Sequence, residues 1–188
     1  MEISAAALDG VLILTPKVFE DSRGWFMETY SQKQITPFGV DSVFVQENHS
    51  FSAKKGTLRG LHFQTNPHAQ SKLVRCTRGR ILDVAVDLRR GSPSFCKWIS
   101  LELSAENKRQ LFIPKGFAHG FVTLADNTEV QYQVDDYYDP GCDRSIRYDD
   151  PDFQIQWPVS QPFLSEKDRN APRFADSDTN FAYEGERN

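Results

Sequence analysis

The segment Ile81-Leu82-Asp83-Val84-Ala85-Val86-Asp87-Leu88 indicates the fold class of this 188-residue chain. Apolar residues recur at every second position, and a period of two is typical of a β-strand with one buried face. The residues on that face are Leu82, Val84, Val86 and Leu88. The same alternation occurs in Lys97–Leu103 and in Glu129–Val134, where Tyr132 lies on the apolar face. These segments predict β-strands with one buried face each.

Shorter candidate strands occur along the rest of the chain, separated by turn-forming residues. They are Val11–Thr15, Val43–Asn48, Lys72–Arg78, Leu111–Ile113, Phe121–Leu124 and Ile146–Tyr148. The turns between strands are rich in glycine and proline, as in Arg90-Gly91-Ser92-Pro93 and Asp139-Pro140-Gly141. Short strands at such regular spacing predict an all-β sandwich or barrel. Short helical turns are expected at Ser31–Ile35, at Ser104–Gln110 and after Ser165, which can cap a helix.

The length of the chain and the lack of a linker-like segment favour a single domain over residues 1–188. The net charge is -4 with both signs interspersed, so no surface for nucleic acid or for an anionic membrane is expected. The three cysteines include no CxxC pair, which predicts reduced thiols. The sequence shows no signal peptide and no long apolar run, and the expected location is the cytoplasm. The ends of the chain are expected to wrap the barrel or a neighbouring subunit, with a polar, loosely packed tail after Arg173.

Histidine is the residue type most able to provide chemistry here. The chain has His49, His62, His68 and His119. His62 lies in the strand-like segment Arg59-Gly60-Leu61-His62-Phe63-Gln64. Residues three apart point to opposite faces of a regular strand, but a β-bulge at Gly60 would re-aim Arg59 or His62. A hydrogen-bonded core histidine is the alternative interpretation of His62.

A metal site is the first hypothesis that a small barrel invites. Barrels of the cupin kind often bind a metal through two histidines one residue apart, a carboxylate and a distant histidine. Here Gln64 stands where the second histidine would be. His119 would be the distant ligand, but two histidines without a placed carboxylate make a poor site. The sequence therefore predicts no bound metal.

Tyr132 and Asp168 each have a structural and a functional interpretation. Tyr132 is either a core tyrosine, which the pattern favours, or a general acid in the barrel mouth. Asp168, in Leu164–Asp168, is an ordinary first-turn carboxylate unless it contacts His62. A carboxylate on one imidazole nitrogen fixes the tautomer and raises the basicity of the other nitrogen. The sequence has no dinucleotide fingerprint, P-loop or GxSxG motif, so these residues alone predict a barrel with a histidine-centred pocket.

Taken together, the motifs of the chain resemble the dTDP-4-dehydrorhamnose 3,5-epimerase family. The matching segments occur in the family's order: Asp21–Glu28, Val45–Ser50, Gly56–Gln64, Gln70–Arg75, Ile113–Phe121, Tyr132 with Asp136–Tyr138, and Leu164–Asp168. The resemblance implies a cupin-type jelly-roll barrel, a double-sheet sandwich with a few short helices. It also implies a homodimer in which N-terminal strands help to line the partner's pocket, and it implies no cofactor and no metal.

The resemblance also implies a reaction. The family's substrate is dTDP-4-dehydro-6-deoxy-α-D-glucose, whose C4 ketone acidifies the hydrogens on C3 and C5. Removal of one proton gives an enolate, and reprotonation from the opposite face inverts that carbon. Two such events give dTDP-4-dehydro-β-L-rhamnose. By the resemblance, His62 is the base, Asp168 orients it, Tyr132 is the acid, and Lys72 stabilises the enolate at the C4 oxygen.

Substrate binding is implied for a larger set of residues. They are Arg23, Phe26, Glu28, Gln46, Glu47, Asn48, Arg59, His119, Tyr138, Asp143 and Lys167. In this scheme Arg59 and His119 bind the diphosphate or neighbouring sugar oxygens, Tyr138 stacks on the thymine, and part of the nucleotide site comes from the partner chain. Asp143 stands where the family usually has glutamate.

Three alternatives share part of this pattern. An epimerase acting only at C3 or only at C5 of another 4-keto sugar nucleotide would have the same four catalytic residues. A non-catalytic jelly-roll sugar-binding module would not need a base and an acid on opposite faces. A metal-dependent cupin would contain stoichiometric iron, manganese or zinc.

Overall fold

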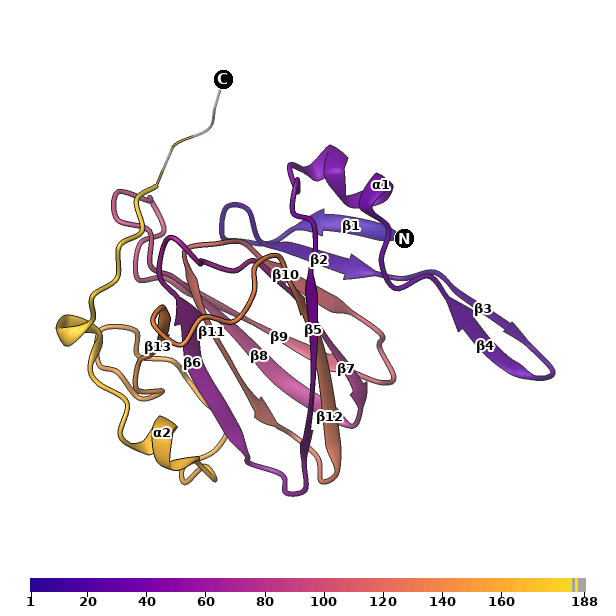
Figure 1. The fold of residues 1–188 in the computed structure, drawn as a ribbon. Coiled ribbons are helices and arrows are strands. Elements are labelled where there is room, and N and C mark those ends of the chain that lie inside the picture. Colours follow the sequence, from indigo (N-terminus) through magenta and orange to yellow (C-terminus); the bar gives the residue numbers. More distant parts are fainter. Residues whose placement is uncertain (184, 186–188) are drawn as a thin grey trace.

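Two antiparallel β-sheets face each other in the computed structural model, which describes residues 1–183 and 185 (Figure 1). In the first sheet the strand order is β1 (Glu2–Ala5), β2 (Leu12–Thr15), β10 (Gln110–Ile113), β7 (Lys72–Arg78), β12 (Thr128–Val134) and β5 (Gln46–Ser52). In the second sheet the order is β13 (Asp143–Ser145), β6 (Leu58–Gln64), β11 (Phe117–Thr123), β8 (Arg80–Asp87) and β9 (Trp98–Ser104). The core between the sheets takes side chains from both, such as Val74 and Ile81. The expected all-β, double-sheet fold is confirmed.

The boundaries of the strands agree with the sequence expectation in some places and differ in others. β7 covers the predicted segment Lys72–Arg78, whereas β5 begins at Gln46 and β11 at Phe117. The strand expected at Ile146–Tyr148 is wrong, because β13 spans Asp143–Ser145. In these three strands the bounds depend on pairing with a neighbour: β5 pairs with β12 along its whole length, β11 with β8, and β13 with β6. Alternation of apolar residues does not reveal such pairing, because β5 is mostly polar and β11 is buried on both faces.

A hairpin of β3 (Val18–Asp21) and β4 (Gly24–Met27) projects away from the two sheets (Figure 1). Three of its aromatic side chains remain open to solvent within the chain: Phe19 is 54% exposed, Trp25 57% and Phe26 69%. Large exposed apolar groups gathered in one place mark an interaction surface more often than chance exposure. This hairpin is called the arm below.

The helices are short: α1 (Gln32–Ile35), η1 (Thr36–Phe38), α2 (Glu166–Arg169) and η2 (Phe174–Asp176). The expected helical turn at Ser104–Gln110 is wrong. Side-chain bonds between Ser104 and Asn107 close a tight turn, and Lys108 follows with a left-handed φ of 56° that ends any helix. None of the helices in the described part of the chain has the length and apolar character needed to cross a membrane.

Strand β8 is buried on both faces, so the expectation of a half-buried strand was wrong. Ile81 and Ala85 point into the core between the sheets. Val84 and Val86, which the alternation marked as the buried face, point the other way and pack beneath the C-terminal part of the chain. A remote segment therefore covers the face that the local pattern would leave to solvent.

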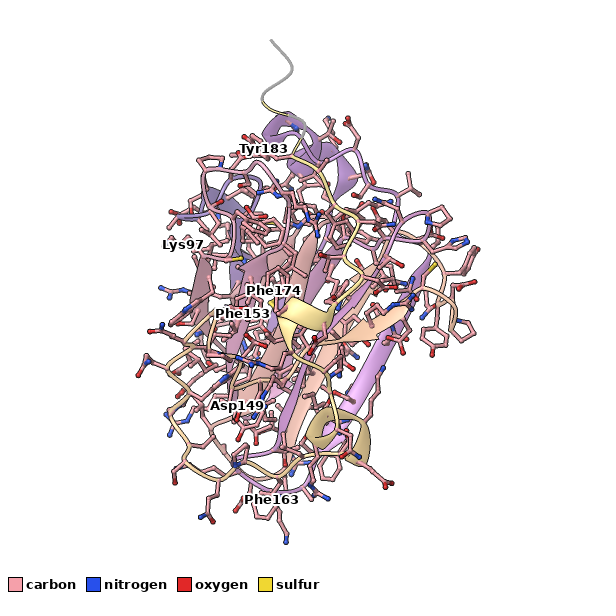
Figure 2. The ribbon with its side chains drawn as sticks, turned by 90° about the vertical axis from the view of Figure 1, so that its left-hand side faces the viewer. Lys97, Asp149, Phe153, Phe163, Phe174 and Tyr183 are labelled. Atoms are coloured by element: carbon pink, nitrogen blue, oxygen red, sulfur yellow. The ribbon has the colours of Figure 1, made fainter. Side chains whose placement is uncertain are left out.

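This covering segment is well packed, contrary to the expectation of a loose tail after Arg173. Phe174 packs against Phe153, with ring centroids 5.0 Å apart, and Phe181 is only 5% exposed. Figure 2 shows Phe153 and Phe174 together in the middle of this face, with Tyr183 and Phe163 toward its two ends. The apolar residues scattered through the polar tail explain the difference, because each fills a place on the outer face of the second sheet.

A β-bulge in β6 brings two functional candidates to the same face. His62 pairs with His119 and Arg59 pairs with Phe121, so β6 contains one more residue than β11 between these two pairs. Gly60 lies within the bulge with φ +136°, and a Cβ on it would be 2.5 Å from the Cα of Gly120. The predicted bulge is confirmed, and glycine is required there by both backbone conformation and space.

We expect Gly60→Ala to lower the free energy of unfolding by roughly 1–3 kcal/mol or more, because alanine fits neither the positive φ nor the contact with β11. Urea or thermal unfolding followed by circular dichroism measures the effect. Gly185→Ala is the control, since a Cβ there meets no atom within 4 Å. Equal stability of both variants would show that β6 does not depend on glycine at this position.

Candidate active site

A cavity of about 560 Å³ lies between the two sheets, and most of the candidate residues line it. The second sheet contributes Arg59 and His62 from β6 and His119 from β11. The first sheet contributes Lys72 from β7 and Tyr132 from β12. Side chains far apart in the sequence, from Arg59 to Tyr132, therefore surround one space, with the histidines on one wall and the lysine and tyrosine on the other.

His62 is oriented by a buried carboxylate. Its Nε2 lies 2.5 Å from Oδ1 of Asp168, whose side chain is only 3% exposed. Burial by itself would raise the pKa of Asp168, but hydrogen bonds from His62 and Ser165 outweigh burial and hold this pKa below its usual value. An ionised carboxylate keeps the imidazole proton on Nε2 and leaves the lone pair on Nδ1. The contact that would make Asp168 functional is therefore present.

Asp168 reaches His62 because a capped helix presents it. The Ser165 hydroxyl accepts a hydrogen bond from the backbone N–H of Asp168 at 3.1 Å and donates to Oδ2 of the same residue at 2.9 Å. This is the N-cap arrangement that serine favours. Ahead of the helix, the backbone N–H of Leu58 donates to the carbonyl of Phe163 at 3.0 Å, which fastens the segment to the start of β6. The predicted cap at Ser165 is confirmed.

Lys72 is buried on the facing wall, with 7% of its surface exposed. Its Nζ donates to the backbone oxygen of His62 at 3.2 Å, across the space between the sheets, and lies 6.0 Å from the ring centre of Tyr132. Burial lowers the pKa of Lys72 to about 8, although the charges of Asp83 and Asp143 oppose the shift. Near neutral pH the ammonium is still mostly charged and poorly hydrated, which strengthens its attraction for a developing anion.

Tyr132 has the surroundings of both a core tyrosine and a residue of the barrel mouth, the two interpretations offered by the sequence. Its ring packs against the core beside Val130, and it also lines the cavity. Burial raises the pKa of Tyr132 above its usual value, so the hydroxyl keeps its proton at neutral pH. Because Tyr132 and His62 belong to different sheets, a proton donor and a proton acceptor stand on opposite walls.

His119 is paired with a carboxylate that the sequence interpretation overlooked. The Nε2 of His119 lies 2.7 Å from Oδ1 of Asp83, and the Asp83 side chain is fully buried on β8. Burial lowers the pKa of His119, while Asp83 opposes that shift. The clue was in the sequence, since an acidic residue interrupts an otherwise apolar strand. A strand with one buried face gives this residue no buried partner, so alternation alone does not single out Asp83.

The remaining members of the cavity lining form its rim. Arg59 is anchored by hydrogen bonds to Ser52 Oγ at 3.3 Å and to a backbone carbonyl at 3.1 Å. Oδ2 of Asp143 accepts hydrogen bonds from Lys167 Nζ at 2.5 Å and from the Tyr138 hydroxyl at 3.3 Å. The Tyr138 ring is 58% exposed, so it offers a flat apolar face to solvent at the rim.

Three of the expected binding residues lie on β5, at the edge of the first sheet. Gln46 and Asn48 pair with Val134 and Tyr132, which places their side chains on the inner face of the sheet. Glu47 points to the outer face, where it accepts a hydrogen bond from Gln133 at 3.1 Å. Within this chain none of the three is part of the cavity lining that the described residues form.

The other three, Arg23, Phe26 and Glu28, lie on the arm or directly after it. Arg23 pairs with Asp21 at 2.6 Å, and Glu28 accepts a hydrogen bond from Gln34 at 2.6 Å. The arm extends away from the barrel to which it belongs (Figure 1), and its side chains do not reach the cavity described above.

Apolar side chains complete the cavity, and the sequence interpretation did not single them out. Phe121 and Leu58 line its interior, and Phe163 lies at its rim. A phenylalanine in a strand looks like any core residue in a sequence. Only the gap between the sheets distinguishes those whose ring edges remain free for a ligand.

Gln64 occupies the position of the second histidine ligand of metal-binding cupins, and its side chain makes hydrogen bonds to neighbouring backbone groups. Its side-chain nitrogen donates to the carbonyls of His68 and Tyr137 at 2.6 and 3.1 Å, and its oxygen accepts from the backbone N–H of Asp139 at 2.8 Å. The amide thus holds the loop that carries Tyr138. Among the residues that the structure describes, no three His, Cys, Asp or Glu side chains form a metal-binding group.

Comparison with known proteins agrees with the site. The family model for dTDP-4-dehydrorhamnose 3,5-epimerase matches residues 5–176. The Salmonella typhimurium dTDP-4-dehydrorhamnose 3,5-epimerase is 53% identical over 174 residues, which cover 92% of this chain and 94% of the relative. The Shigella flexneri enzyme of that name is 50% identical over 179 residues, covering 95% and 98%.

Solved structures extend the likeness to three dimensions. The Legionella pneumophila dTDP-6-deoxy-D-glucose-3,5-epimerase, solved in complex with dTDP-4-keto-L-rhamnose, matches with a TM-score of 0.91 at 43% identity and covers 97% of this chain and 98% of its own. The Bacillus anthracis dTDP-4-dehydrorhamnose 3,5-epimerase, solved with TDP and PPi bound, has a TM-score of 0.89 at 48% identity, with coverage of 92% and 98%. The expected cupin-type barrel is therefore confirmed, and the chain belongs to the dTDP-4-dehydrorhamnose 3,5-epimerase family.

Proposed function

We propose that the cavity between the sheets is where this chain carries out its 3,5-epimerase reaction, with His62 as base and Tyr132 as acid. Membership of the family establishes the activity itself, an isomerisation in dTDP-L-rhamnose biosynthesis. The observation that carries the assignment of residues is the pairing of His62 with Asp168 at 2.5 Å, on the wall opposite Tyr132.

Proton transfer follows from this arrangement. The C4 ketone of dTDP-4-dehydro-6-deoxy-D-glucose acidifies the hydrogens on C3 and C5, and Nδ1 of His62 removes one of them to leave an enolate. The Tyr132 hydroxyl then protonates the same carbon from the facing wall, which inverts it. Solvent exchange returns both side chains to their starting states, and a second round at the other carbon gives dTDP-4-dehydro-L-rhamnose. A positioned base of this kind contributes roughly 10²–10⁴-fold to a rate.

Lys72 stabilises the intermediate. In the enolate the negative charge collects on the C4 oxygen, and a buried ammonium beside that oxygen opposes the charge without having to reorganise water. The pKa of about 8 leaves most of the Lys72 population charged at neutral pH. The ketone of the substrate provides the acidity, so the scheme requires no cofactor.

Binding of the nucleotide is assigned to the rim. Arg59 and His119 suit the diphosphate or the neighbouring sugar oxygens, since arginine offers paired donors to phosphate. Tyr138 would stack on the thymine through its exposed face. Asp143 and Lys167 hold each other at 2.5 Å, and Asp143 also accepts from Tyr138, so the rim is organised before a ligand arrives.

We expect chelator-treated protein to incorporate deuterium at both C3 and C5 when it is incubated with dTDP-4-dehydro-6-deoxy-D-glucose in D₂O. Exchange at both carbons follows from a base that serves two acidic positions, and proton NMR reports it directly. Added reductase should convert the product to dTDP-L-rhamnose. Label at a single carbon would instead indicate an epimerase of one position, and activity restored only by iron, manganese or zinc would indicate a metal-dependent cupin.

The control for this experiment is His62→Ala, which removes the base and leaves the rim intact. It should reduce exchange at both carbons by roughly 10²–10⁴-fold, while dTDP still binds by calorimetry. His49→Ala is a matched histidine outside the cavity, paired with Glu129 at 3.1 Å on the outer face, and it should exchange normally. Normal exchange in His62→Ala would remove His62 from the role of base.

Tyr132→Phe is expected to separate exchange from inversion. Without the hydroxyl, the enolate still forms at His62 and takes its proton back from the same side, so solvent deuterium enters without net epimerisation. The loss in product formation should be roughly 10²-fold or more. NMR of the recovered sugar nucleotide measures both quantities in one sample. If double inversion continued at the normal rate, Tyr132 would be a packing residue only.

We further propose that two copies of the chain form a homodimer in which each arm reaches the cavity of the other copy. Arg23, Phe26 and Glu28 belong to the expected nucleotide site but lie far from the cavity of their own barrel (Figure 1). The exposed aromatic side chains of the arm give it an apolar surface to bury against a partner. A symmetric dimer would complete both sites at once.

Mixing two defective variants tests this exchange of arms. The double variant Arg23→Ala, Phe26→Ala has a weakened arm, and His62→Ala has no base. In a mixed dimer one site combines an intact base with an intact arm from the partner, so random mixing should restore about a quarter of wild-type activity. Activity that stays at the level of the separate variants after unfolding and refolding together would show that the arm serves its own chain.

A further inference from the structure

Asp83 is an unusual residue for the centre of a core strand. Its side chain is completely buried on β8, and Oδ1 lies 2.7 Å from Nε2 of His119. Its second oxygen, Oδ2, has no hydrogen-bond partner among the described residues. A buried carboxylate with one unsatisfied oxygen destabilises a fold unless nearby positive charge compensates it.

The compensation comes from the wall of the cavity. His119 and Lys72 are both nearly buried, at 6% and 7% exposure, and Asp83 attracts the charged form of each. Among the described residues, other charged or titratable groups near Lys72 come from β6, β12, β13 and α2. They are His62 on β6, Tyr132 on β12, Asp143 on β13 and Lys167 on α2.

These groups differ in how well water screens them. Lys167 is half exposed, with its Nζ on Asp143 at 2.5 Å, so the pair at the rim largely neutralises itself. Asp83 is the carboxylate that lies beneath the cavity, away from water, and its field acts on Lys72 through a low dielectric.

Resting on the function proposed above, we propose that Asp83 is a positioning residue that supplies the buried negative charge of the active site, orienting His119 and keeping Lys72 in its cationic form. Holding Nε2 of His119 turns Nδ1 of that ring toward the cavity, where it can meet a substrate oxygen. Keeping Lys72 charged preserves the group that stabilises the enolate. One carboxylate thereby serves both binding and chemistry without touching the substrate.

The same strand contains a matched comparison. Asp87 is four residues further along β8 and is also fully buried. Its carboxylate, however, is satisfied by Arg89 at 2.8 Å, Ser92 at 2.6 Å and Ser94 at 2.7 Å, outside the cavity. Asp87 therefore has the burial of Asp83 but a purely structural set of partners.

We expect Asp83→Asn, which keeps the shape and removes the charge, to move the alkaline limb of the kcat/KM profile toward lower pH by about one unit. The sign follows from Lys72: it acts in its protonated form, and loss of a neighbouring anion favours the neutral amine. This limb belongs to Lys72, with a pKa of about 8, because the pKa of Tyr132 is raised above 10.0. Asp87→Asn should lower the melting temperature and leave the limb in place.

His119→Gln provides a second variant that keeps the carboxylate, in case Asp83→Asn does not fold. It should leave the limb at the wild-type pH or move it to higher pH, since Asp83 then acts on Lys72 alone. An unchanged limb in folded Asp83→Asn, or a limb displaced to lower pH in His119→Gln, would overturn the role of Asp83. If one of these two results were found while His62→Ala remained inactive, only the role of Asp83 would be overturned. If His62→Ala were active, the proposed function itself would be overturned.

Discussion

The backbones of β6 and β11 touch at two glycines, Gly60 and Gly120, and the geometry of the active site depends on this contact. Because neither residue has a side chain, the strands can approach closely while β6 takes up the extra residue of its bulge. The bulge turns Arg59 and His62 to the same wall. Lys72 depends on it as well, since its ammonium is held by the backbone oxygen of His62.

Around this frame, the cavity gives three groups of different chemistry separate surroundings. An epimerase of this type needs a neutral imidazole, a charged ammonium and a protonated phenol within a few side chains of each other. Here each group has its own surroundings: a carboxylate on a capped helix orients His62, buried negative charge favours the ammonium of Lys72, and burial raises the pKa of Tyr132 so that the phenol keeps its proton. Because the groups come from different strands, the protein can set each environment separately.

The sequence was informative wherever a local rule decides the outcome. Alternation located β9 and β12, the capping preference of serine located the cap at Ser165, and Gly60 in the segment Arg59–Gln64 located the bulge in β6. The resemblance to a family added the candidate residues, most of which the fold brings to one cavity. These predictions succeed because neighbours in sequence determine them.

Local rules failed where distant segments decide burial. Asp83 was overlooked because a strand with one apolar face was expected to leave its other face to solvent. The tail was expected to be loose because its composition is polar, although Phe181 is buried. Gln46 and Asn48 were grouped with Glu47, yet strand pairing sends Glu47 to the opposite face. In each case the deciding contact lies with a strand or segment far away in the chain.

The C-terminal segment that covers β8 also contains Asp168, and this has a consequence for how the protein matures. As the chain leaves the ribosome, the strands of the second sheet emerge well before the residues that shield their outer face. Until those residues arrive, Val84 and Val86 remain open to water or to a chaperone. The same late segment contains the carboxylate that contacts His62, so a barrel without this segment also lacks the Asp168 partner of His62. The part of the chain that completes the outer face of the barrel is thus also the part that brings Asp168 to His62.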